Sequence, residues 1–356
     1  MPKSRKRHIK KKSFQRREPS IYKFIERMNR ATDLMERGSF LEAREILQEL
    51  DKRFPNQPEV LTELANVNFE LRDMQGHQEV CERLVKFMPE DDLLLKSLAG
   101  SYLINMRIAK SFFMFERFLS LYPEHEDAEH ARETARKIEE ELKKHWGDYG
   151  LTENEMLEMA VLHEDIQVAL ENGEIKKGIT AAEKLLLRVP DFVSARNNLS
   201  QMLFFDDQAE RAIEEANLVL KTDSENAHAL SNLTRFLFLA GREQEAHNVA
   251  VRLKKVETKH IEIAIKKAEA FSYLGDDSAI IEIFEDAKRR SLVEECHEPL
   301  LPHLTAFALC RLGKEKDARD LWEQCLKASP GFGFARENMD ELRKPTVKET
   351  RLMLIL

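Results

Sequence analysis

The chain has 356 residues, of which 34% are charged and 42% hydrophobic, and its formal net charge is −8 at pH 7. This length is too great for a single compact core. No apolar run approaches the roughly 18 residues of a membrane-spanning helix and no signal peptide is evident, so we expect no membrane partner and a reducing compartment, cytoplasmic or, in a eukaryote, nuclear.

The first twenty residues differ from the rest of the chain in charge. They hold nine basic residues and one acidic residue, a net of +8, whereas the remainder has a net of −16. We interpret residues 1–20 as a basic, disordered tail. It could bind nucleic-acid phosphates, act as a nuclear address or stay solvated, and the sequence leaves these alternatives open. The basic side chains are Lys3, Arg5, Lys6, Arg7, Lys10, Lys11, Lys12, Arg16 and Arg17.

A glycine turn, an amphipathic helix and a proline recur along the rest of the chain. In the first copy, Gly38 can adopt the left-handed backbone that ends a helix, Ala43 and Leu47 share an apolar face, and Pro55 cannot continue the helix. The same punctuation returns at 34-residue spacing at Pro55, Pro89 and Pro123, and at Gly241 and Gly275. No β-type alternation persists, so we predict an all-α chain.

Small residues recur at two further positions of each repeat. In the first helix they are Ala31, Ala65, Ala99, Ser200, Thr234, Ala268 and Ala306. In the second helix they are Ala43, Ala212, Ala246 and Ala318, with the departures His77, Ser111, Gly178 and Ile280. This pattern resembles the tetratricopeptide repeat. The resemblance covers about three quarters of the chain and implies an α-solenoid of about eight helix pairs, each packed on its neighbours.

The rhythm predicts two repeat modules. Residues 21–125 carry three repeats and residues 159–332 carry five, and between them residues 126–158 form charged capping helices, with a capping box at Thr152 and Glu155. Residues 333–356 hold a closing helix and an apolar tail. We favour docking of that tail on the last repeat over contact with a partner or a second copy.

A polar stripe runs along the first helices of the second module. Asn198, Gln201 and Phe205 lie at i, i+3 and i+7, beside the apolar stripe rather than on it. The same positions in the next two repeats hold Asn232, Arg235 and Leu239, then Lys266, Glu269 and Tyr273. A polar stripe next to a core stripe faces either solvent or a ligand.

The family resemblance gives this stripe a possible use. Several peptide-binding members use asparagine at the position matched by Asn29, Asn198 and Asn232, because an amide both donates to and accepts from a peptide backbone. Apolar contacts would come from Phe205, Phe238 or Tyr273. The basic carboxylate clamp of some members is not complete here, since Arg235 and Lys266 fall outside its expected positions. The alternative is that the asparagines are only solvated.

No pattern typical of catalysis, a metal site or a cofactor emerges. Cys296 lies near His297 and His303 without zinc spacing, and no phosphate-binding glycine loop or nucleophile elbow occurs. Cys81 and Cys325 are expected in the core. We therefore predict a non-enzymatic protein-binding scaffold that grips a protein or peptide. The alternatives are a nucleic-acid- or ribonucleoprotein-associated factor that uses the basic tail, and a self-assembling array.

Overall fold

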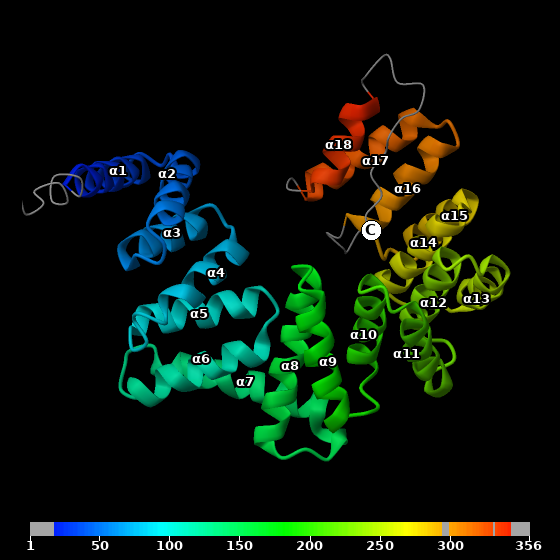
Figure 1. The fold of residues 1–356 in the computed structure, drawn as a ribbon, viewed down its shortest axis with the longest axis horizontal. Coiled ribbons are helices and arrows are strands. Elements are labelled where there is room, and N and C mark those ends of the chain that lie inside the picture. The colour runs from blue at the N-terminus through cyan, green and yellow to red at the C-terminus, as the bar shows by residue number, and fades with distance from the viewer. Residues whose placement is uncertain (1–17, 294–298, 330–331, 343–356) are drawn as a thin grey trace, which may run out of the picture. The chain divides into compact units, whose positions relative to one another are not determined.

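The computed structural model describes residues 18–293, 299–329 and 332–342, and within these ranges the chain is helical and contains no strand (Figure 1). The chain divides into two compact units, Met1–Glu164 and Asp165–Leu356. Helix α8 (Glu153–Glu171) contains the boundary. The predicted tail roles of residues 1–17 and 352–356, and the thiol of Cys296, lie outside the described residues.

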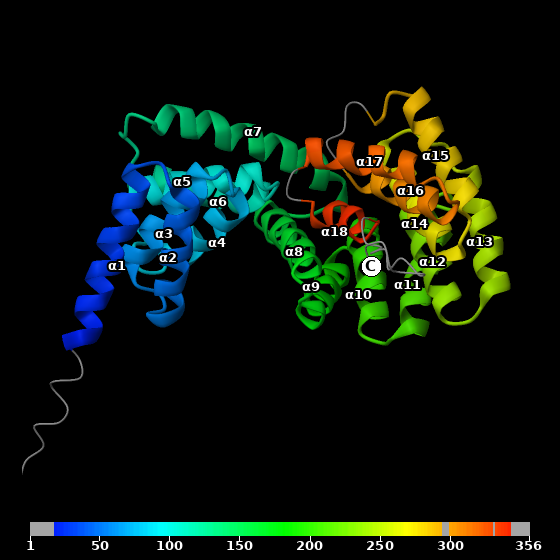
Figure 2. The same cartoon turned by 90° about the horizontal axis from the view of Figure 1, so that it is seen from above.

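The first unit consists of three helix pairs followed by one long charged helix (Figure 2). Each helix packs against the next one in the chain. The helices are α1 (Glu18–Glu36), α2 (Phe40–Arg53), α3 (Pro58–Glu70), α4 (Met74–Leu84), α5 (Asp92–Ile104), α6 (Ile108–Leu121) and α7 (Ala128–Trp146). A 3₁₀ turn at Gly147–Tyr149 ends α7, and the capping box is confirmed, since Thr152 N–H donates to Glu155 Oε2 at 2.9 Å and Glu155 N–H to Thr152 Oγ1 at 3.3 Å.

The second unit continues with helix pairs and ends on a single helix. After the last turns of α8 come α9 (Ile175–Arg188), α10 (Val193–Phe205), α11 (Ala209–Thr222), α12 (Ala227–Leu239), α13 (Glu243–Lys255), α14 (Ile261–Leu274), α15 (Asp277–Arg289), α16 (Leu300–Arg311), α17 (Glu315–Ala328) and α18 (Gly333–Leu342). Within this unit the first helices also pack on one another, α10 on α12, α12 on α14 and α14 on α16 (Figure 1). These four helices therefore form one continuous face, which we call the inner face.

The prediction of an all-α solenoid of helix pairs is confirmed. Each predicted repeat contains two helices joined by a tight turn, and the predicted closing helix is α18. One residue of each turn has a positive φ, at Gly38, Arg72, Met106, Gly173, Asp207, Gly241, Gly275 and Gly313. The left-handed turn is thus more regular than the glycines alone indicate. A non-glycine residue in this conformation costs about 1–2 kcal/mol.

The second-helix departures from alanine each have a local explanation. His77 Nδ1 lies 2.8 Å from the backbone oxygen of Ala65, and Ser111 Oγ donates to that of Ala99 at 2.8 Å, so both polar side chains are satisfied inside the pair. At Gly178 an added Cβ would lie 2.3 Å from Met202 Sδ, because the buried methionine fills the space that alanine occupies in other repeats.

The described thiols behave as apolar core groups. Cys81 and Cys325 are buried, as expected, and burial raises the pKa of each to about 12. In the ranges that the structure covers, no histidine, cysteine or acidic side chains gather in a group that could hold a metal. No helix there is both long and apolar enough to cross a membrane.

Candidate functional site

The inner face of the second unit holds a nearly buried arginine enclosed by aromatic rings. Arg235 of α12 is only 9% exposed. Its guanidinium carbon lies 5.7 Å from the ring centroid of Phe205 on α10, 5.3 Å from that of Phe236 on α12 and 5.9 Å from that of Tyr273 on α14. Three consecutive first helices therefore contribute to one cluster, which we call the arginine cage.

The guanidinium of Arg235 lacks conventional partners. Its Nε and Nη2 atoms are shut off from solvent and meet no hydrogen-bond acceptor in the described part of the chain. A buried donor without an acceptor costs about 1–3 kcal/mol, and more when it is charged. The ring faces return part of this, about 2 kcal/mol for a desolvated cation–π contact. The remaining donor capacity points to a group that the chain itself does not supply.

One ring of the cage is fixed and another is exposed. Phe236 is fully buried and stacks on Phe204 of α10, with centroids 4.5 Å apart and planes at 12°. Phe205 is 44% exposed at the last turn of α10. The cage thus has a rigid wall and an outer wall that faces solvent. The sequence predicted Phe205, Arg235 and Tyr273 as face residues but missed Phe204 and Phe236.

The two asparagines of the polar stripe differ in their surroundings. Asn232 is buried, and its Nδ2 donates to the backbone oxygen of Asn197 at 3.3 Å and to Ser200 Oγ at 3.2 Å. It therefore ties α12 to α10. Asn198 and Gln201 are half-buried on α10, and neither amide makes a hydrogen bond to the residues that the structure describes.

The remaining predicted residues lie on or away from this face. Lys266 of α14 donates to Glu269 Oε2 at 2.8 Å, which neutralises its charge locally. Phe238 is half-buried near the end of α12. Asn29 is exposed on α1 in the first unit, so it is not part of the arginine cage.

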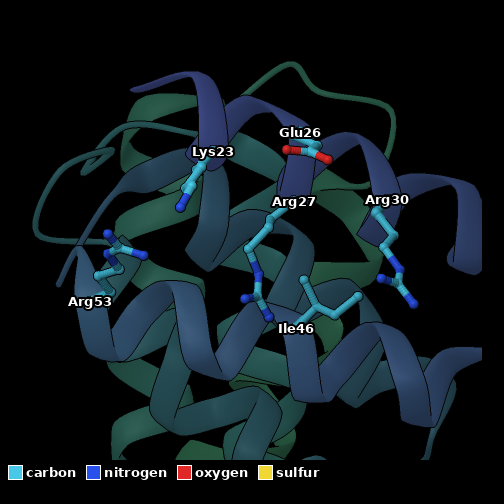
Figure 3. A pocket seen from close by; sticks show the side chains of 6 residues that line it. All are labelled: Lys23, Glu26, Arg27, Arg30, Ile46 and Arg53. Atoms are coloured by element: carbon cyan, nitrogen blue, oxygen red, sulfur yellow. The ribbon is translucent and has the colours of Figure 1, made fainter. Parts of the chain in front are cut away.

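A second candidate site is a basic cleft between α1 and α2, of about 360 Å³ (Figure 3). Its lining residues are Lys23, Glu26, Arg27, Arg30, Ile46 and Arg53. Arg27 is held by both carboxylate oxygens of Glu49, one of them at 2.8 Å. Lys23 and Arg30 form no ion pair with residues inside the described ranges, so their charges are uncompensated there.

A buried carboxyl joins α8 to the first unit. Glu164 is 4% exposed and accepts the backbone N–H groups of Ala109 at 2.6 Å and Lys110 at 3.1 Å, at the start of α6. Burial raises its pKa to about 7, against the lowering effect of these bonds. Burial, with nearby positive charge, lowers the pKa of the adjacent His163 to about 4. No sequence signal identified this carboxyl.

Comparison with known proteins finds similarity to repeat proteins. No family model matches the chain. A curated TPR repeat-containing protein of Bacillus subtilis, YvcD, is 25% identical over 131 residues, which is 36% of this chain and 27% of the relative. The matched stretch is therefore about a quarter of that relative's length.

Solved structures of similar architecture are distant in sequence. A tetratricopeptide repeat protein from Parabacteroides merdae is 12% identical, with a TM-score of 0.44 over 79% of this chain and 96% of its own. Yeast Tom70 is 12% identical, with a TM-score of 0.37 over 87% and 77%. MamA from Desulfovibrio magneticus RS-1 is 19% identical, with a TM-score of 0.31 over 57% and 97%.

The class follows from the chain's own repeats together with the curated relative. Helix pairs that recur with a 34-residue period, each closed by a left-handed turn and a small second-helix residue, define an α-solenoid of the tetratricopeptide type. The chain belongs to the tetratricopeptide repeat proteins.

Proposed function

We propose that the chain is a non-enzymatic scaffold of the cytoplasm whose second unit binds a protein segment on its inner face. The observation that carries this proposal is the arginine cage, because an unsatisfied cation and an exposed ring occur together where three first helices meet. Such a face binds by presenting fixed groups, with little ordering of its own on association.

The half-buried amides define the path of the bound segment. Asn198 and Gln201 lie one turn apart on α10, and Phe205 follows one turn further on. Their amides can each donate to and accept from an extended backbone without reading its side chains. Phe205 and Tyr273 add apolar contact. Asn232 contributes indirectly, since its hydrogen bonds hold α12 against α10.

A photo-crosslinking experiment tests this assignment. A benzophenone amino acid replaces Phe205 on the inner face or, as the matched control, Leu218, an exposed apolar residue of the second helix α11. After irradiation in native lysate, we expect a discrete crosslinked protein from position 205 only, competed away by excess unmodified chain. Equal yields from both positions, or none from position 205, would overturn the proposal.

A second candidate function is binding of nucleic acid by the first unit. The basic cleft favours it, because Lys23 and Arg30 lie on α1, directly after the nine basic residues of the tail. Tail and cleft together would contact consecutive phosphates. Each neutralised phosphate releases counterions, so the affinity would fall steeply with salt.

The salt response separates the two candidates. A labelled mixed-sequence RNA oligonucleotide is titrated with the full chain, a form lacking residues 1–17 and a Lys23→Gln/Arg30→Gln variant. Nucleic-acid binding predicts an affinity loss of at least about a thousandfold between about 50 and 200 mM salt, and weaker binding by both altered forms. Binding that is equal in all three forms would exclude the cleft as a phosphate site.

A further inference from the structure

We propose that the arginine cage is a subsite for a single carboxylate group of the bound segment. The inference rests on the proposed function, since it names what one part of the inner face recognises. Arg235 is more than nine-tenths buried, and its Nε and Nη2 atoms have no acceptor among the described residues. A planar carboxylate is the group that matches a guanidinium edge with two parallel hydrogen bonds.

The local charge favours a carboxylate over a phosphoryl group. Arg235 forms no ion pair with any residue that the structure describes, whereas Lys266 on the next first helix is paired with Glu269 at 2.8 Å. The cage therefore presents one uncompensated positive charge. A carboxylate carries one negative charge and neutralises it, whereas a phosphate monoester near neutral pH carries almost two.

The aromatic walls add selectivity. Phe236 is buried and held by Phe204, so it fixes the guanidinium plane from one side. Phe205 is the exposed wall, and its side-chain rotation opens the guanidinium edge to the inner face. An apolar residue beside the carboxylate would then pack on Phe205 and Tyr273. The expected ligand is an acidic group next to an apolar side chain.

This arrangement differs from a clamp built of several basic residues. One arginine supplies the whole charge, and aromatic rings replace further cations. The carboxylate can come from an internal Asp or Glu side chain or from the end of a chain. Both sources present the same chemistry, so the experiment must distinguish them.

Selection from a random peptide library provides the test. The full chain is immobilised as wild type, as Arg235→Met, and as the charge-matched control Arg252→Met, an exposed residue of the second helix α13. Selected peptides are resynthesised with free and amidated C-termini and with each Glu or Asp changed to Gln or Asn. Their dissociation constants are measured by fluorescence anisotropy, and photo-crosslinking from position 205 locates them on the chain.

We expect wild type and Arg252→Met to select peptides with an acidic group beside an apolar residue. Arg235→Met should weaken such peptides by about tenfold or more, and Arg235→Lys should recover part of the loss, because an ammonium lacks the planar fork. Loss on amidation identifies a chain terminus, and loss on Glu→Gln identifies a side chain. Peptides that crosslink at position 205 without acidic preference, and bind Arg235→Met equally, would overturn the subsite while leaving the proposed function standing. Peptides that never crosslink there would count against both.

Discussion

The two units use their charged side chains differently. In the first unit, Arg83 of α4 donates through Nη1 and Nη2 to the two carboxylate oxygens of Asp51, both at 2.7 Å, and also to Asn56 Oδ1. Even the buried carboxyl of Glu164 finds two backbone donors there. In the second unit, Arg235 is more deeply buried than Arg83 and meets only ring faces.

This contrast separates structural charge from charge kept for binding. The hydrogen bonds of Arg83 hold the pKa of Asp51 below its ordinary value, so the pair stabilises repeat stacking at neutral pH. Arg235 gains no such compensation, and its burial lowers stability. The chain has two tryptophans, Trp146 in the first unit and Trp322 in the second, both buried, so fluorescence can follow each unit separately.

The largest expected effect concerns Glu164. Its pKa is about 7 in the folded chain against an ordinary value of 4.5, so the folded state binds more protons between these values and its stability falls as pH rises through them. We predict that the unfolding free energy of wild type relative to Glu164→Gln falls by about 3 kcal/mol from pH 4.5 to 7. Urea unfolding followed by Trp146 fluorescence in a Trp322→Phe background measures it.

The neighbouring histidine titrates in the opposite sense. The pKa of His163 is about 4 against an ordinary 6.5, so its contribution to stability rises with pH between these values. It is present in both chains and cancels in their difference. Parallel pH profiles for wild type and Glu164→Gln would show that Glu164 is not protonated in the folded unit.

The two arginines give the next effect. We predict that Arg83→Met destabilises the first unit by about 2 kcal/mol, because it breaks a two-pronged ion pair in which Arg83 is 34% exposed. Arg235→Met should change the second unit by less than about 1 kcal/mol or stabilise it, because an apolar side chain relieves an unsatisfied buried cation. Trp146 and Trp322 report the respective urea midpoints. A larger loss at Arg235 than at Arg83 would reverse the contrast.

A smaller effect is expected at the second-helix small position. Gly178→Ala places a Cβ against the sulfur of Met202, so we predict a loss of about 1 kcal/mol after the gain in helix propensity is deducted. The added variant Met202→Ala should abolish this loss by clearing the space. If Gly178→Ala is stabilising in the Met202 background, the close contact does not constrain the repeat.

The smallest effect concerns the turns. Met106 is exposed at φ +58°, the position that Gly241 holds at +76°. We predict that Met106→Gly stabilises the first unit by up to about 1 kcal/mol, whereas Gly241→Ala destabilises the second by a similar amount. Thermal unfolding of the two variants checks both signs. A destabilising Met106→Gly would mean that unfolded-state entropy outweighs the turn strain.

The sequence predicted what depends on period and missed what depends on contact between repeats. Recurrent glycines and prolines were sufficient for the helix pairs, but the left-handed turns at Arg72 and Met106 carry no compositional signal. Likewise Arg235 was identified as a face residue from its spacing alone. Its enclosure was not predictable, because the rings come from helices whose rotation about their axes depends on packing. The predicted module bounds and the use of the inner face remain predictions.

The most direct test of the contrast compares the same repeat position in both units. Phe205 precedes the left-handed residue Asp207 by two positions, and Ile104 precedes Met106 by two, and both side chains are exposed. A benzophenone amino acid is placed at each position in turn, and crosslinked partner is quantified from native lysate. The account predicts a yield from position 205 that exceeds that from position 104 by about tenfold and falls with Arg235→Met. Equal yields, or a higher yield from position 104, would contradict it.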